Sequence, residues 1–206
     1  MTVGLVLALL AAYGIGSFPT AYLLGRAKGI DFRTIGSGNL GATNVFRTLG
    51  WKWGLLVYAV DLGKGAFSVM WLPVIASVAG GWPWGVAFGI AAILGHVRPV
   101  FLLGKGGGKG VATASGVFLA LTPIPMVSAL VAFMIVVTAT RYVSLGSLVG
   151  AVVLPVVLAI REQRVTPLLI VSVCVSAFVF WTHRDNIGRL RRGEESRVGK
   201  SGQARA

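Results

Sequence analysis

The chain has 206 residues, of which 55% are hydrophobic and only 12% carry a charged side chain. Soluble domains carry about 25% charged residues, so this composition excludes an ordinary soluble protein and places the chain in the membrane class. Nineteen Lys and Arg against six Asp and Glu give a formal net charge of +13, and the one cysteine, Cys174, excludes a disulfide framework and argues against a thiolate metal site.

Long stretches without Asp, Glu, Lys or Arg predict membrane-spanning helices, because about 30 Å of hydrocarbon takes roughly 20 helical residues. These stretches are Val3–Gly25, Gly65–Val97, Gly110–Thr140, Tyr142–Ile160 and Val165–His183. The second is interrupted by Gly80-Gly81-Trp82-Pro83-Trp84 and the third by Thr122-Pro123-Ile124-Pro125, so dividing both predicts seven helices. Gly110–Leu121 is short, and a re-entrant or half-spanning helix is the alternative there. The N-terminus lacks a basic region, which favours a retained first span over a cleaved signal.

Basic residues gather on one side of this predicted bundle. On that side lie Arg26, Lys28, Arg33, Arg47, Lys52, Arg98, Lys105, Lys109, Arg141 and seven more from Arg184 onward. The opposite side holds Arg161 and Arg164. By the positive-inside rule the N-terminus is then outside and the C-terminus is cytoplasmic, which requires an odd number of spans.

We therefore predict an all-α, polytopic membrane protein with seven transmembrane helices. Residues 1–195 are expected to form one domain, followed by a basic, disordered tail over 196–206 whose charge is explained by attraction to anionic lipid. The bilayer is the expected partner, and no nucleic-acid-binding fold is visible.

A glycine-rich polar segment, Gly36–Asn44 with the sequence G-S-G-N-L-G-A-T-N, stands between two apolar regions and continues to Arg47. Glycines let backbone N–H groups approach a ligand closely, and hydroxyls and amides add donors. Arg47 can bind phosphate bidentately. This segment, called the island loop below, predicts an anion site; the alternative is a flexible interhelical loop.

A second polar cluster, Asp61-Leu62-Gly63-Lys64-Gly65, falls inside the membrane if its helix begins near Trp53. Asp61, Lys64 and Ser68 then share one helix face. A charge at the centre of a membrane helix costs about 2.5–3.5 kcal/mol, so an intramembrane pair is a functional hypothesis by default. A salt bridge that merely holds helices together is an equally good interpretation.

The third cluster joins Gly95-His96 to Lys105-Gly106-Gly107-Gly108-Lys109-Gly110, which opens a helix. We call Lys105–Gly110 the glycine loop. Amides at a helix N-terminus, aided by lysine, suit an anion. The loop is not a Walker A motif, because Gly110 stands where Ser or Thr is needed, so nucleotide hydrolysis is not supported. His96, as a lone histidine near a helix end, is also typical of a structural role.

Two smaller clusters lie at cytoplasmic turns. One spans Arg141–Ser147, and the other runs from His183 through Asn186 to Glu194-Glu195. Membrane anchoring explains the arginines but not the His, Asn and Glu among them.

Together these residues resemble the bacterial acyl-phosphate:glycerol-3-phosphate acyltransferases of the PlsY type. The motifs, in order, are G-S-G-N-x-G-A-T-N-x-x-R, D-x-x-K-G, G-H followed by G-G-K-G-V-A-T, R-x-x-S-x-x-S, and H-R-x-N-I-x-R-L-x-x-G-x-E. The likeness runs from about Gly14 to Glu195. The family spaces its loop as basic-Gly-Gly-basic-Gly, whereas Lys105 here is followed by three glycines before Lys109.

The resemblance implies an inner-membrane enzyme that moves a fatty acyl group from acyl phosphate to the 1-hydroxyl of sn-glycerol 3-phosphate, giving lysophosphatidate and phosphate at the cytoplasmic face. It implies catalytic roles for Ser37, Arg47, His183 and Asn186, glycerol-phosphate binding by Gly107, Gly108 and Lys109, and a structural role for Glu195. Further expected substrate-binding positions, with Glu195 also counted among them, are Gly36, Asn39, Thr43, Asn44, Lys64, His96, Lys105, Gly110 and Ser144. No metal or cofactor is expected.

Two rival functions are weaker on the sequence. An anion transporter with glycine-loop gates is disfavoured because no internal repeat is visible. A metal-dependent phosphotransferase needs several carboxylates, and before the C-terminal glutamates the predicted cytoplasmic side offers Asp31, Asp61 and Asp185. A CoA-dependent acyltransferase with a His-x4-Asp signature is also disfavoured, because Phe101 and Gly188 stand where the Asp is needed.

Overall fold

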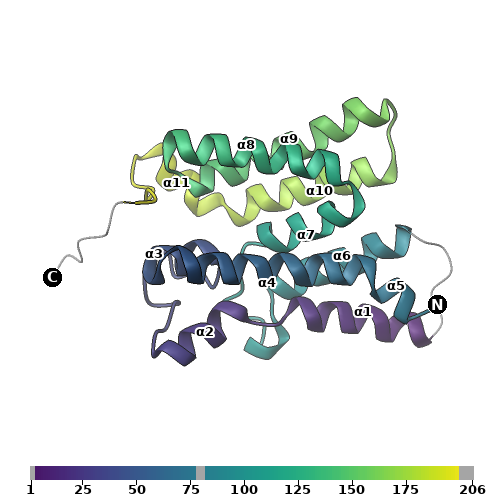
Figure 1. The fold of residues 1–206 in the computed structure, drawn as a ribbon, viewed down its shortest axis with the longest axis horizontal. Helices are drawn as coiled ribbons and strands as arrows, with labels where there is room; N and C mark the ends of the chain where they lie inside the picture. The colour runs from purple at the N-terminus through teal and green to yellow at the C-terminus, as the bar shows by residue number, and fades with distance from the viewer. Residues whose placement is uncertain (1–2, 78–81, 200–206) are drawn as a thin grey trace. The chain divides into compact units, whose positions relative to one another are not determined.

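The computed structural model describes residues 3–77 and 82–199, and within these ranges all regular structure is helical (Figure 1). The chain divides into two compact units, Met1–Ile124 and Pro125–Ala206. The first contains α1 (Val3–Gly16), α2 (Thr20–Lys28), α3 (Ala42–Leu49), α4 (Trp51–Met70), α5 (Leu72–Ile75), α6 (Trp82–Val97), the 3-10 turn η1 (Val100–Leu102) and α7 (Val111–Leu121). The second contains α8 (Pro123–Thr140), α9 (Val143–Glu162), α10 (Pro167–Thr182) and α11 (Arg184–Arg191).

The first apolar stretch is broken between α1 and α2, which the sequence analysis did not predict. The break spans Ser17–Pro19, since proline at this point lacks the N–H that would continue the helix. Ser17 Oγ donates to the Tyr13 carbonyl at 2.7 Å and accepts from the Val100 backbone N–H at 3.2 Å. The hydrogen bond from Val100 therefore connects the segment between α1 and α2 to η1.

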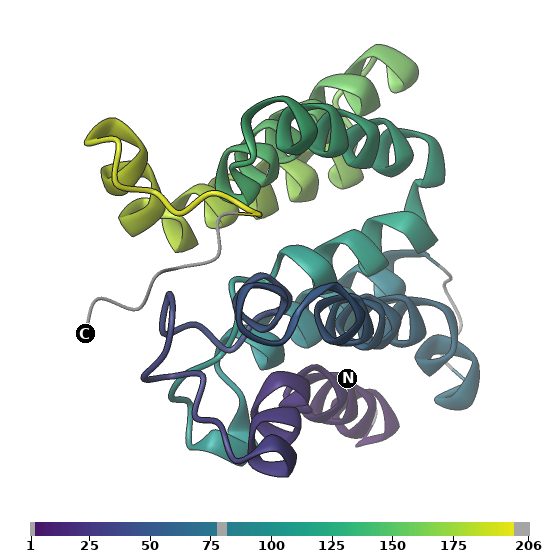
Figure 2. The same ribbon diagram turned by 60° about the vertical axis from the view of Figure 1, so that its left-hand side comes forward.

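Glycines let the helices of the first unit approach each other closely. α4 packs along α7 (Figure 2). Gly65 of α4 lies against the backbone carbonyl of Thr113, and Gly116 of α7 lies against the carbonyl of Leu62. A Cβ at either glycine would collide with backbone that cannot move aside. Small residues serve such close contacts between membrane helices, where apolar burial supplies little drive. α4, which carries Asp61 and Lys64, is thereby held tightly.

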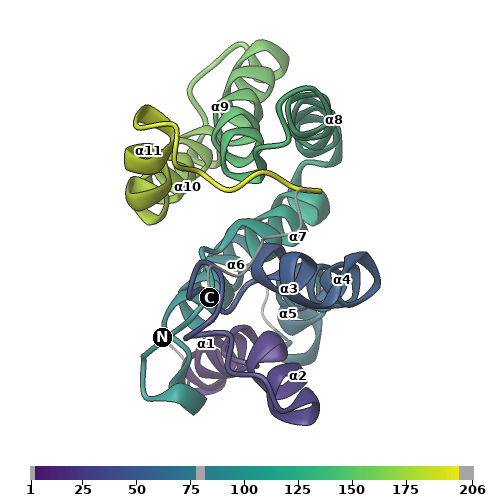
Figure 3. The same ribbon diagram turned by 90° about the vertical axis from the view of Figure 1, so that its left-hand side faces the viewer.

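In the second unit, α8 and α9 meet through Gly146 and Gly150, which lie against Phe133 and Ala129 respectively. α9 also packs on α10, and α11 contacts both α9 and α10. α10 begins at Pro167 behind Thr166, whose hydroxyl accepts from the Leu169 N–H at 3.2 Å. After α11 the chain runs back towards α9 (Figure 3).

The helices agree with a membrane protein. Among the described residues, four segments are long and apolar enough to cross a bilayer: Val3–Lys28, Pro83–Leu102, Pro123–Thr140 and Val143–Glu162. α10 and α11 form a fifth candidate if the pair, bent by 59°, is one span. α7 has 11 residues, or about 16 Å at 1.5 Å per residue, which is too short to cross alone and favours the half-spanning alternative. Seven spans and their orientation stay a prediction.

Two predicted features fall partly outside the described residues. The first is the interruption predicted at Gly80–Trp84: Gly80 and Gly81 lie outside the described residues, and α6 begins at Trp82. Of the predicted tail, 200–206 are outside, whereas the Val198 N–H donates to the Arg141 carbonyl at 2.8 Å and Arg197 lies over the Tyr142 ring.

Candidate functional site

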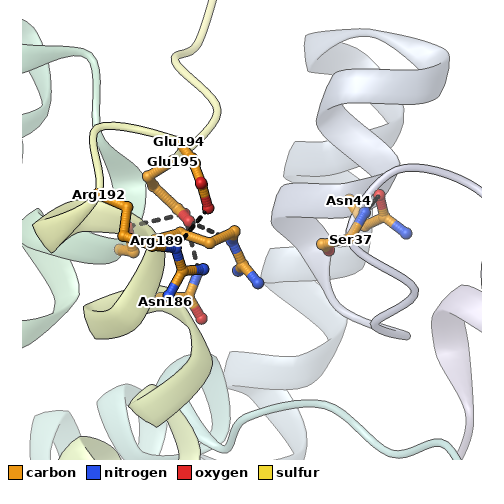
Figure 4. Close-up of polar contacts among 8 residues, drawn as sticks. Ser37, Asn44, Asn186, Arg189, Arg192, Glu194 and Glu195 are labelled. Carbon is orange, nitrogen blue, oxygen red and sulfur yellow. Dashed lines mark hydrogen bonds and ion pairs between the residues drawn. The ribbon is translucent and has the colours of Figure 1, made fainter.

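The island loop is organised by the side chain of Asn44, which is 1% exposed. Its amide nitrogen faces three carbonyl oxygens, those of Phe32 at 3.0 Å, Ile35 at 3.0 Å and Asn39 at 3.1 Å. Its oxygen accepts from the Ser37 N–H at 3.2 Å (Figure 4). One buried amide therefore ties Ser37 and Asn39 of the island loop to Phe32 and Ile35 just before it, which gives Asn44 an organising role.

The loop conformation also depends on glycine. Gly36 has a φ of 64°, in the left-handed region, and a Cβ there would collide with the Asn44 side-chain oxygen. The Ser37 side chain stays exposed, while Asn39, Thr43 and Arg47 are half-buried. The loop thus presents Ser37 outward and places Arg47 on the short helix α3 that follows.

Beneath the island loop lies an apolar cluster that seats it on the neighbouring helices. This cluster consists of Ala21, Phe32, Leu40, Val45 and Val57. α2, α3 and α4 each contribute one residue to this cluster. Apolar packing therefore fixes the loop against three helices.

The second polar cluster is buried, and it joins α2, α4 and α6. Asp61 is 2% exposed and its Oδ1 accepts from Lys64 Nζ at 2.9 Å and from Thr20 Oγ1 at 3.0 Å. Lys64 Nζ also donates at 3.1 Å to the Phe18 carbonyl, which lies in the break before α2 and accepts from the Thr20 backbone N–H as well. The salt bridge itself lies within α4, and the hydrogen bonds to Thr20 and Phe18 connect it to the start of α2 and to the break before it.

The glycine loop lies directly against the end of α6. The Gly108 N–H donates to the His96 carbonyl at 3.1 Å. A Cβ at Gly108 would collide with His96 Nε2, and one at Gly107 would collide with the carbonyls of His96 and Val97. Lys105 is exposed and Lys109 is half-buried. Gly110 caps α7 with a φ of 84°, a conformation that glycine adopts without strain.

A small cavity connects these two features. It has a volume of about 10 Å³, close to the space that one water needs. The residues that line it include Asp61, Lys64 and His96 together with Thr20 and Gly106–Gly108. The motifs that the sequence analysis treated as separate therefore meet here.

In the second unit, Glu195 is the centre of a hydrogen-bonded group (Figure 4). Its Oε1 accepts from Asn186 Nδ2 at 2.7 Å and from Ser144 Oγ at 2.9 Å, and its Oε2 accepts from Arg189 Nε at 2.7 Å. Burial raises the pKa of Glu195, but the hydrogen bonds from Arg189, Asn186 and Ser144 outweigh it, so the pKa lies below its ordinary value. Glu195 thus fastens the segment after α11 to α9 and α11.

His183 stands between α10 and α11 and is 4% exposed. Its Nδ1 is 2.8 Å from the Val179 carbonyl. Because a carbonyl only accepts, Nδ1 carries the proton in the neutral ring, and Nε2 is the basic nitrogen. This tautomer suits a proton acceptor.

The structure brings the predicted residues together in three groups. The first comprises Gly36, Ser37, Asn39 and Asn44. The second comprises Lys64, His96, Gly107 and Gly108. The third comprises Ser144, Asn186 and Glu195. Within residues 3–77 and 82–199, no group of three or more His, Cys, Asp or Glu is placed to hold a metal ion.

Two participants were missed by the sequence analysis. Thr20 donates to Asp61, and the signal for it was Pro19, which starts a helix inside an apolar stretch and leaves a polar residue at its beginning. Arg189 binds Glu195, and its spacing of three residues from Asn186 on one helix would have placed both on the same face.

Known proteins match the chain over most of its length. The family profile described as Glycerol-3-phosphate acyltransferase matches residues 6–193. A glycerol-3-phosphate acyltransferase of Geobacter sulfurreducens is 47% identical over 187 residues, covering 90% of this chain and 93% of the relative. One from Synechococcus elongatus is 44% identical over 206 residues and covers 97% of each chain.

Two solved structures are similar to this chain in both sequence and fold. The crystal structure of PlsY (YgiH), an integral membrane glycerol 3-phosphate acyltransferase, in its glycerol 3-phosphate form has a TM-score of 0.85 at 35% identity, covering 95% of this chain and 96% of that one. Its lysophosphatidic acid form has a TM-score of 0.82 at 34% identity, covering 95% of each chain. Sequence and fold thus confirm the resemblance, and this chain belongs to the glycerol-3-phosphate acyltransferase (PlsY) family of integral membrane proteins.

Proposed function

We propose that the chain transfers a fatty acyl group from acyl phosphate to the 1-hydroxyl of sn-glycerol 3-phosphate, forming lysophosphatidate and inorganic phosphate. One observation carries the proposal beyond family membership. The first unit holds two glycine-rich loops, each supported from behind by a buried polar side chain; Arg47 follows the first loop and Lys109 lies in the second. Two such loops suit two phosphorylated substrates.

The reaction demands positioning more than activation, because acyl phosphate is already an activated donor. The glycerol hydroxyl oxygen bonds to the acyl carbon, the bond from that carbon to the phosphate oxygen breaks, and phosphate leaves with the electron pair. The hydroxyl proton goes to the departing phosphate or to Nε2 of His183. Backbone and side-chain donors of the island loop stabilise the developing oxyanion, and the two loops hold the reactants in contact.

The proposal assigns roles to the predicted residues. Arg47 and Ser37 contact the acyl phosphate, Lys109 with Gly107 and Gly108 binds glycerol 3-phosphate, and Asn186 supports catalysis. Glu195 keeps Asn186 and Ser144 in place. The protein crosses the inner membrane with seven spans, N-terminus outside, and reacts at the cytoplasmic face.

The test is an assay of purified protein in lipid nanodiscs with labelled glycerol 3-phosphate and either acyl phosphate or acyl-CoA. Lysophosphatidate formed from acyl phosphate alone is the expected result. Product from acyl-CoA alone would overturn the donor, and no product from either would overturn the function. A covalent acyl group trapped on Ser37 would replace direct transfer by a two-step path.

A further inference from the structure

His96 occupies an unusual position for a buried histidine. It is 7% exposed and lies at the C-terminal end of α6, with a buried carboxylate on one side and a glycine on the other. The proposed reaction gives it no chemical step. A histidine that merely fills a core has no need of either neighbour, so both contacts require an explanation.

On one side, His96 supports the glycine loop through its backbone and its ring. Its carbonyl accepts from the Gly108 N–H at 3.1 Å. Its ring nitrogen Nε2 occupies the space that a Cβ of Gly108 would need. Gly107 rests instead on backbone, the carbonyls of His96 and Val97. The ring therefore defines how closely Gly108 can approach α6.

On the other side, the ring faces a carboxylate that is itself fixed. His96 Nδ1 lies 3.8 Å from Asp61 Oδ1, which is outside hydrogen-bond distance but leaves no room for another group between them. Asp61 is held by Thr20 and Lys64, which belong to α2 and α4. Because the approach is short and both groups are buried, the imidazole is confined between Asp61 and Gly108.

We propose that His96 is a positioning residue: its imidazole sets the path of Gly106–Gly108 and hence the position of Lys109, and Asp61 acts on the loop through His96. This inference rests on the proposed function, since it assigns the loop to the phosphate of glycerol 3-phosphate. It predicts that His96 governs the KM for glycerol 3-phosphate and not the KM for the acyl donor.

The two glycines allow a matched experiment. The collision created by Gly108→Ala is with the His96 ring and disappears when that ring is removed, whereas the collision created by Gly107→Ala is with backbone and persists. The variants are His96→Ala, Gly108→Ala, Gly107→Ala and the two doubles that contain His96→Ala. For each we measure kcat, both KM values and the melting temperature. Ser172→Ala, a buried hydroxyl on α10 that donates to the Leu169 carbonyl, is the control and keeps wild-type kinetics.

His96→Ala is expected to lower kcat/KM for glycerol 3-phosphate about 10- to 100-fold, the scale of a small misplacement of a binding group. The double variant with Gly108→Ala is expected to be no worse than His96→Ala alone. In the double variant with Gly107→Ala the two losses multiply. If His96→Ala does not fold, His96→Asn carries the same series, because its shorter side chain also withdraws from Gly108.

Three outcomes overturn the inference: an unchanged KM for glycerol 3-phosphate in His96→Ala, equal loss for both substrates, or multiplicative loss in both doubles. These results are read against a wild-type enzyme that forms lysophosphatidate. If the wild type forms none, it is the proposed function that has failed.

Discussion

Asp61 and Glu195, the two buried acidic side chains among the described residues, are satisfied by different kinds of partner. Asp61 faces Lys64, and the side chains of both are nearly inaccessible, 3% and 6% exposed. Glu195 faces Arg189, whose side chain is 32% exposed, and it gains neutral hydrogen bonds from Ser144 and Asn186. Each charge at the first site is almost closed to water if its partner is lost, whereas Arg189 at the second can be hydrated.

The contrast indicates different uses of a carboxylate. The Asp61–Lys64 pair lies within α4 and bonds to Thr20 at the start of α2 and to the Phe18 carbonyl, next to the glycine loop. Glu195 fastens a chain segment to helices near the C-terminus. Removing one partner of a buried ion pair lowers the free energy of unfolding by more than the intact pair adds to it. The reason is that the remaining charge is buried without a counter-charge.

The largest effect is expected for Asp61→Ala, which leaves the Lys64 ammonium buried without a counter-charge. We expect the free energy of unfolding to fall by about 3–5 kcal/mol, measured by thermal denaturation in detergent. The double variant Asp61→Ala/Lys64→Met, which removes both charges, should recover most of the loss. Equal melting temperatures for the single variant and the wild type would show that the pair is not closed to water.

Glu195→Ala is expected to have a smaller effect, because it removes the acceptor for Asn186 and Ser144 but leaves Arg189 able to reach solvent. We expect a loss of about 1–3 kcal/mol. Glu195→Gln, which keeps one acceptor oxygen, should lose about half as much. Melting temperatures of both variants test this, and a loss in Glu195→Gln as large as that in Asp61→Ala would contradict the comparison.

Lowering the pH should separate the contribution of Glu195 to stability from that of the other buried groups. Its folded pKa is below the ordinary value of 4.5, so its stabilisation is complete above pH 4.5 and is lost as the pH falls through the lower folded pKa. The melting temperature of the wild type should therefore decrease below about pH 4.5 by more than that of Glu195→Gln. If the melting temperatures of the two proteins fell in parallel with decreasing pH, this prediction would be contradicted.

The smallest effect is expected at the exposed pair Asp31–Arg33, which serves as the reference for a carboxylate in water. The side-chain hydrogen bond from Arg33 lowers the pKa of Asp31 to about 2, yet the two side chains are 40% and 50% exposed. Solvent screens such pairs. We expect Arg33→Ala to leave the melting temperature unchanged within error; a clear decrease would mean that this loop is more constrained than its exposure indicates.

The sequence predicts helix boundaries best where they depend on the residues of one segment alone. α8, α9 and α10 begin and end close to the apolar stretches predicted for them, because a membrane helix satisfies its backbone within one segment. The interruption at Thr122–Pro125 is confirmed by the end of α7 at Leu121 and the start of α8 at Pro123. The break after Gly16 was missed because hydropathy does not register one serine and one proline within an apolar run.

The site shows a similar division. That the island loop and the glycine loop are sites of polar chemistry follows from their composition, since neither has a place in an apolar bundle. Asn44 organises the loop through its side-chain hydrogen bonds, and Lys64 is bonded to Asp61 and Phe18; that either contacts substrate stays a prediction. Residue type predicts that a side chain will be bonded but does not identify its partner.

By itself, the sequence determined that this is an all-helical membrane protein, which family it belongs to, and which short segments carry its polar chemistry. These properties depend on composition and on spacing along one segment. Only the tertiary structure decided that Thr20, Asp61, His96 and Gly108 meet at one point. They lie on separate segments, and the close packing of α4 on α7 and of α1 on α6 brings them together, so no local pattern in the chain could have paired them.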